Sequence, residues 1–177
     1  MYYIFTSLEL KINSNNIKII SNIKGKRKLD RIKWDMIGMQ KWAKNNKITP
    51  DIIVSLQNTG VRFKDIPQMV YIHQPLPYAK ESKWNLLKAD EKKMWFYKNI
   101  YKVWIDLTVK NKADIVVQTK WMKTALLDRG YSEKRITIAK PHMKKIDTFN
   151  VQIRTKPYKY LFYPAADYKY KNHTILI

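Results

Sequence analysis

Short apolar runs alternate along the chain with longer stretches in which apolar residues recur at helical spacing. A short, predominantly apolar run such as that at 51–56 is typical of a strand that is buried on both faces of a parallel sheet. We expect residues 68–73 and 113–118 to form similar buried strands. Further strands are predicted at residues 2–6, 16–21, 135–139 and 158–163.

The segments between these strands carry the periodicity of amphipathic helices. Helices are predicted at residues 28–46, 81–112 and 120–129, and the second of them is expected to be broken once. Thr119 is placed to cap the third helix at its start, and Gly130 stands where a glycine ends a helix.

Alternating strands and helices predict an α/β fold built on a doubly wound parallel sheet. In such a sheet ligands bind beyond the carboxyl ends of the strands. Polar segments follow four of the predicted strands, at residues 57–59, 73–75, 118–119 and 140–142. We therefore expect these segments to gather at one edge of the sheet and to form a ligand-binding rim.

Composition narrows the classes of function. The 177 residues hold 35 Lys and Arg against 14 Asp and Glu, a net charge of +21 that indicates a negatively charged partner. The chain has no cysteine, which excludes disulfides, and its four separated glycines exclude a Walker loop and a GxGxxG fingerprint. With no apolar run of about 18 residues and no signal peptide, a cytoplasmic location is expected.

Five stretches closely resemble, in their order and spacing, one group of proteins. They are PDIIVSLQNTG (50–60), PQMVYIHQPLP (67–77), ADIVVQTKWMK (113–123), RITIAKP (135–141) and LFYPAADYKYKNH (161–173). The group is the GT-B glycosyltransferases of glycosyltransferase family 4. The resemblance runs from about residue 50 to the end, and the earlier segment matches only in general character.

The resemblance implies two Rossmann-like domains that face a cleft. Residues 1–146 would be the N-terminal, acceptor-side domain without its first strand, 147–157 a linker, and 158–177 the opening strand and helix start of the donor domain. The intact enzyme would transfer a sugar from a nucleotide-sugar donor to a saccharide or lipid-linked acceptor, with retention, in surface polysaccharide biosynthesis. No metal and no cofactor other than the donor substrate are expected.

The resemblance also assigns roles to individual side chains. His73 would contact and orient the reacting groups in the cleft, and Lys171 would meet the donor diphosphate. Acceptor-binding roles are implied for Asn58, Thr59, Gln74, Gln118 and Thr119. Three of these assignments have a structural alternative: His73 could be satisfied by local backbone, residues 58–60 could form a turn, and Thr119 could act as a helix cap alone.

The charge of the chain and the predicted sheet topology indicate which partners it could bind. The aromatic and basic stretch at 84–109 is either a core helix or a surface that sits on the inner face of an anionic membrane. A doubly wound sheet without its central first strand would expose two inner edges, which a second polypeptide could complete. The alternatives are a basic nucleic-acid-binding module, for which no RNP motif, helix-turn-helix spacing or zinc finger is present, and a non-functional remnant of a glycosyltransferase.

Overall fold

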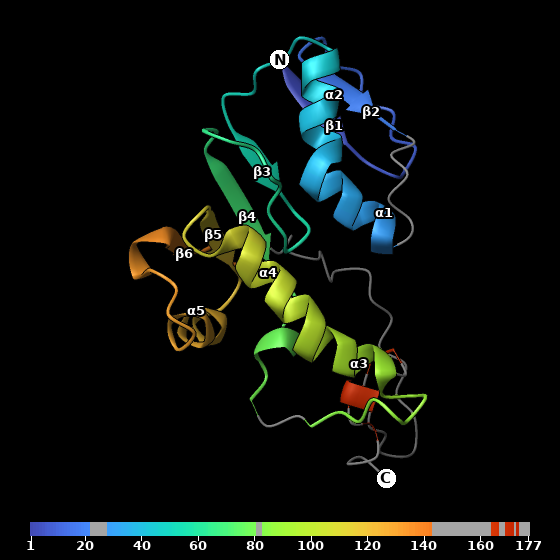
Figure 1. The fold of residues 1–177 in the computed structure, drawn as a ribbon, viewed down its shortest axis with the longest axis vertical. Helices are drawn as coiled ribbons and strands as arrows, with labels where there is room; N and C mark the ends of the chain where they lie inside the picture. The colour runs from blue at the N-terminus through green and yellow to red at the C-terminus, as the bar shows by residue number, and fades with distance from the viewer. Residues whose placement is uncertain (22–27, 81–82, 143–163, 167–168, 172, 174–177) are drawn as a thin grey trace, which may run out of the picture.

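The structure, a computed structural model, describes residues 1–21, 28–80, 83–142, 164–166, 169–171 and 173. These residues form two separate parallel sheets beside a set of helices (Figure 1). The small sheet pairs β1 (Tyr2–Phe5) with β2 (Ile17–Ile20). The larger sheet has the order β3-β4-β5-β6, with β3 at Ile53–Ser55, β4 at Gln68–Ile72, β5 at Asp114–Val117 and β6 at Ile136–Ile138.

The chain is therefore an α/β protein with a four-stranded parallel sheet, compatible with a Rossmann-like fold. Six strands predicted from the sequence are confirmed, each within two residues of its expected ends. The predicted linker at 147–157 and the predicted strand at 158–163 lie outside the described residues.

Two long helical segments are each interrupted by one π-helical turn. The first comprises α1 (Lys28–Lys33), η1 (Trp34–Gly38) and α2 (Met39–Asn45). The second comprises α3 (Lys92–Phe96), η3 (Tyr97–Tyr101) and α4 (Lys102–Val109). The remaining helical elements are α5 (Lys120–Leu127) and the 3-10 turns η2 (Leu76–Tyr78), η4 (Glu133–Arg135) and η5 (Lys169–Lys171).

The helix predicted at 81–112 begins about a dozen residues later than expected. Side chains hold the preceding segment in turns: Glu91 Oε2 accepts the backbone N–H of Asn85 at 2.7 Å, and Asn85 Oδ1 accepts that of Leu87 at 2.8 Å. Because such local bonds satisfy backbone groups outside a helix, they compete with helix formation. The expected single interruption is η3.

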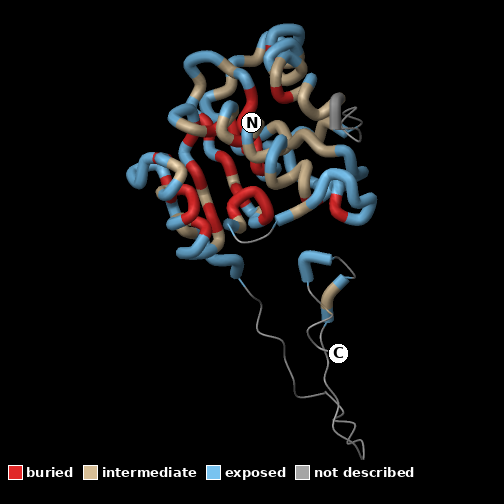
Figure 2. Tube along the Cα trace, turned by 60° about the horizontal axis from the view of Figure 1, so that its bottom comes forward, coloured by how far each residue is buried: buried red, intermediate tan, exposed pale blue. Residues whose placement is uncertain are grey.

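The core lies between the larger sheet and two helices. Val70 and Ile72 of β4, with Ile115 and Val117 of β5, pack against α4 and α5. Figure 2 shows the buried residues along the strands and the inward sides of the helices. Thr119 caps α5 and Gly130 ends it with a φ of 74°, as the sequence predicted.

The expectation that the strands are buried on both faces is wrong. Side chains alternate along a strand, and among the described residues α4 and α5 cover one face of the larger sheet. On the other face Val54 of β3 is 55% exposed and Met69 of β4 is 37% exposed. No helix among the described residues is long and apolar enough to cross a membrane.

Two residues of α4 provide a test of the core assignment. Ile105 is fully buried between α4 and the sheet, whereas Val103 is 51% exposed on the outer face of the same helix. Ile105→Ala should lower the free energy of unfolding by about 2–5 kcal/mol, because it leaves a cavity. Val103→Ala should change it by only about 0.5 kcal/mol, as for other surface substitutions. Urea unfolding followed by circular dichroism measures both, and equal losses would contradict the assignment.

Candidate functional site

The four polar segments that follow β3, β4, β5 and β6 meet at one edge of the larger sheet. These strands are parallel and neighbours in the sheet, so their carboxyl ends lie together. We call this edge the rim and define it by residues 57–59, 73–75, 118–119 and 140–142. The rim brings together the sequence-predicted residues that come from four separate parts of the chain.

Asn58 joins the first two segments of the rim. Its φ of 65° turns the chain back after β3, and its N–H donates to Tyr71 O at 3.2 Å. Its side-chain Oδ1 accepts the backbone N–H groups of His73 at 2.8 Å and Gln74 at 2.9 Å. Asn58 is buried, so this oxygen is used within the protein and fixes the path of the chain as it leaves β4.

Thr59 points inward, beneath the rim. Its Oγ1 donates to Asp35 Oδ2 at 2.9 Å, and its carbonyl accepts the hydroxyl of Ser55 at 2.6 Å. The residue is buried. Thr59 therefore connects the rim to the first helical segment, and the structure does not present its hydroxyl on the surface.

Asp35 is a buried carboxyl group that the sequence analysis missed. It lies in the π turn η1, with Arg31 Nε 3.0 Å from its Oδ1. Burial raises the pKa of Asp35, while Arg31 and Thr59 act in the opposite direction. The signal was present in the sequence, because Asp35 stands three residues after Ile32 and four before Met39, on the predicted apolar stripe.

The centre of the rim is formed by side chains in β4 and directly after β4 and β5. His73 is exposed, and its ring centroid lies 5.6 Å from that of Tyr71, with the two planes inclined by 32°. Gln118 Nε2 donates to the Tyr71 hydroxyl oxygen. An imidazole, an amide and a phenol thus lie close together at the ends of two adjacent strands. Such a set can donate hydrogen bonds to an uncharged ligand and accept hydrogen bonds from it.

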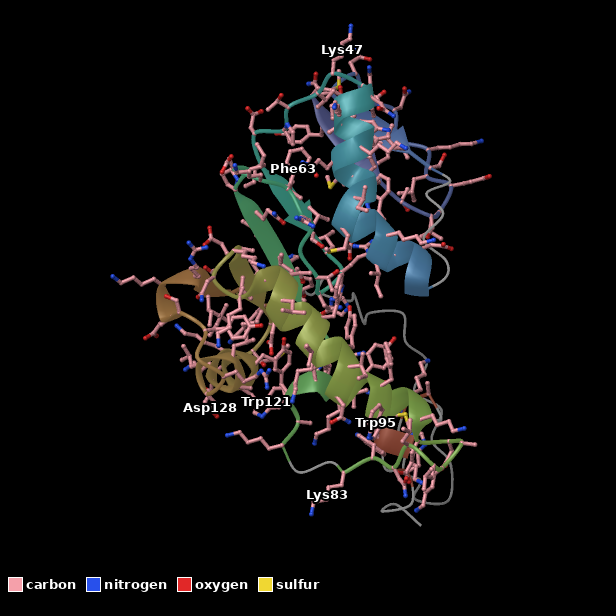
Figure 3. The ribbon with its side chains drawn as sticks, viewed as in Figure 1. Lys47, Phe63, Lys83, Trp95, Trp121 and Asp128 are labelled. Carbon is pink, nitrogen blue, oxygen red and sulfur yellow. The ribbon has the colours of Figure 1, made fainter. Side chains whose placement is uncertain are left out.

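The other predicted site residues differ in how far their side chains are exposed and in whether the protein itself already uses their polar groups. Thr119 Oγ1 accepts the N–H of Met122 at 3.2 Å, so its hydroxyl is engaged in capping α5. Gln74 is half-buried and is held through its backbone by Asn58. Lys140 and His142 are exposed beyond β6. Trp121, half exposed in the first turn of α5, adds an aromatic face that the sequence analysis did not single out (Figure 3).

Lys171 lies apart from the rim. It belongs to η5, which Figure 1 shows beside α3, and its Nζ is 5.4 Å from the ring centroid of Tyr170. Lys169 anchors η5 there, because its Nζ lies 2.9 Å from Asp90 Oδ2 and 2.6 Å from Glu91 Oε1. The structure therefore does not bring Lys171 together with His73. Among the described residues no cluster of His, Asp or Glu could hold a metal ion.

The role of Asn58 can be tested against a second asparagine with a left-handed backbone. Asn58→Gly keeps the positive φ but removes the acceptor of two backbone N–H groups, which should cost about 1–3 kcal/mol of unfolding free energy. Asn111 has a φ of 60° and is exposed, so Asn111→Gly is the matched control and should be close to neutral. Chemical denaturation measures both. Equal effects would mean that the side-chain oxygen of Asn58 contributes nothing.

The buried Asp35 predicts a pH dependence of stability. Because burial raises its pKa above the unfolded value of about 4, the native state holds this proton more tightly. The stability that this contributes is complete below pH ~4 and is lost as the pH rises through the raised pKa. Asp35→Asn should lack this loss, so the stability of wild type minus that of the variant should fall with rising pH. A difference in unfolding free energy between wild type and Asp35→Asn that stays constant from low to high pH would contradict this.

No known protein-family model, no curated protein and no solved structure matches this chain.

Proposed function

We propose that this chain is the acceptor-side domain of a GT-B glycosyltransferase, with a doubly wound sheet completed by further polypeptide. The enzyme would transfer a sugar from a nucleotide-sugar donor to a saccharide or lipid-linked acceptor in surface polysaccharide assembly. One observation carries the proposal: four strand-end segments with exposed polar side chains share one edge of a parallel sheet. This is the position at which α/β sheets bind their ligands.

The chemistry of the rim suits a hydroxyl-rich ligand. Sugar hydroxyls both donate and accept hydrogen bonds, and His73 and Gln118 offer both functions. The Asn58 bonds fix the backbone of His73, so its imidazole is presented from a defined position. In the proposed enzyme His73 orients the acceptor hydroxyl next to the transferred sugar. Trp121 supplies a flat apolar face of the kind on which the C–H side of a sugar ring packs.

A lipid-linked acceptor would bring the domain to a membrane. Ile100, Val103 and Leu107 are exposed at spacings of three and four along η3 and α4. The buried Ile105 and Val109 hold the opposite side of the same segment in the core. This stretch is thus both a core helix and an apolar surface stripe on a chain of charge +21, which suits the inner face of an anionic bilayer.

The proposal is tested by titrating the ¹⁵N-labelled chain with a panel of neutral di- and trisaccharides. We expect chemical-shift changes confined to the rim and the first turn of α5. His73→Ala and Gln118→Ala should each weaken binding about threefold to tenfold, the effect of one hydrogen bond. Gln40, exposed on α2, gives the matched control, and Gln40→Ala should leave binding unchanged.

A parallel titration with single-stranded DNA distinguishes the nucleic-acid alternative. Salt-dependent binding of DNA, together with no response of the rim to any saccharide, would favour a nucleic-acid-binding module and contradict the proposal. Saccharide shifts that are unchanged in both His73→Ala and Gln118→Ala would also contradict it.

A further inference from the structure

Each of the two sheets has two outer edges in the described part of the chain, and β1 and β3 each form one of them. In β1 the N–H of Tyr2 donates to Asn16 O at 2.7 Å, toward β2. Backbone groups alternate in direction along a parallel strand, so those of Tyr3 and Phe5 point away from β2. In β3 the N–H of Ile53 donates to Pro67 O at 3.0 Å, on the β4 side, so the N–H and C=O of Val54 point away from β4.

The same helical turn anchors both of these strands. The ring of Phe5 in β1 lies 5.4 Å from that of Trp34, and the next residue, Asp35, accepts the hydroxyl of Thr59 just after β3. Trp34 and Asp35 are adjacent in η1, so one helical turn contacts both the end of β1 and the segment that follows β3.

Chain topology points to the same arrangement. The segment α1–η1–α2 connects β2 to β3, and Figure 1 shows β1 on the side of the small sheet nearer to β3. A helix that connects two parallel strands ordinarily returns the chain to the same sheet. Here the two strands belong to different sheets. One further strand between β1 and β3 would join the two sheets into one.

The free edge of β3 has the chemistry of a strand acceptor. Ile52, Val54 and Leu56 are all more than half exposed, and residues 52–56 contain no charge, proline or glycine. Unpaired edges that add a strand are of this apolar kind, whereas protected edges carry lysine, proline or a bulge. The occupant must itself be extended, apolar and free of proline. Acidic residues at its ends would complement the charge of +21.

We propose that β1 and β3 take up one extended, apolar strand of a separate polypeptide, which runs between them and joins the two sheets. Main-chain hydrogen bonds to Tyr3 and Phe5 on one side and to Val54 on the other hold this strand. Its side chains pack under Trp34 on the helix side and beside Val54 on the open side. The proposal deepens one part of the proposed function, the completion of the sheet by further polypeptide, but it is argued from the strand edges and holds whether or not the chain acts on sugars.

The test is amide hydrogen exchange with a panel of peptides. Each peptide has a five-residue core of Val, Ile, Leu and Phe with glutamates at both ends, and each has a control with proline at the central position. At least one peptide should slow exchange at Val54, Tyr3 and Phe5 tenfold or more. Exchange at Ile53 and Ser55, whose N–H groups already face β4, should change far less. The proline controls should have no effect.

A matched pair of variants locates the binding edge. Val54→Lys places a charge at the edge and should weaken peptide binding tenfold or more. Leu87→Lys, at an aliphatic residue that is 88% exposed before α3, should leave peptide binding unchanged. Circular dichroism should show that both variants remain folded, because both side chains are exposed. Three results would each overturn the proposal: no peptide alters exchange at Val54, Val54→Lys binds as wild type does, or Val54 becomes protected without peptide as protein concentration rises. The last would make a second copy the occupant.

Discussion

The two hydrogen bonds that the side-chain oxygen of Asn58 accepts from His73 and Gln74 hold the rim together. β3 and β4 would be neighbours without them, because the strand ladder needs only backbone groups. The segments beyond the strands have no such ladder, and their positions depend on side chains. Asn58 adopts a left-handed backbone conformation after β3, which places its side-chain amide at the end of β4. The side chain thereby sets the direction of the backbone at His73.

The buried carboxyl group of Asp35 is a second constraint on the rim. Asp35 is taken out of water to bond Thr59, and Arg31 at 3.0 Å compensates only part of the cost of that burial. The carboxyl group lies in a π turn, and a second π turn, η3, donates the Tyr101 hydroxyl to Gln57 O at 3.1 Å. Both irregular helical turns thus contact the segment after β3. The rim is built on elements that depart from regular helix geometry, as is frequent at functional sites.

The sequence allowed much of the fold to be predicted and less of the site. Apolar runs and helical spacing located the strands and two of the helices, because periodicity reflects which side of an element faces the core. Burial of β3 and β4 on both faces was predicted wrongly, since Val54 and Met69 face a side that no described helix covers, and an apolar run does not reveal what packs on it. The late start of α3 depends on Glu91 reaching back to Asn85, a contact that propensity does not contain.

At the site, strand order followed from topology, so the gathering of His73, Gln118 and Lys140 at one edge could be predicted. The direction of individual side chains could not be. Thr59 was expected to face a ligand and is turned toward Asp35, and Lys171 lies beside α3 because Lys169 is bound by Asp90 and Glu91. These outcomes depend on long-range contacts between segments that are up to 79 residues apart in the chain.

The most direct test of the rim is the hydrogen exchange of two backbone amides. His73 and Gln74 follow the end of β4, and an exposed segment at this position would exchange its amides at nearly the rate of an unfolded peptide. If Asn58 holds the rim as described, both amides exchange at least a hundredfold more slowly in the native chain, and Asn58→Gly abolishes that protection. Rapid exchange of His73 and Gln74 in the unaltered chain would contradict the account.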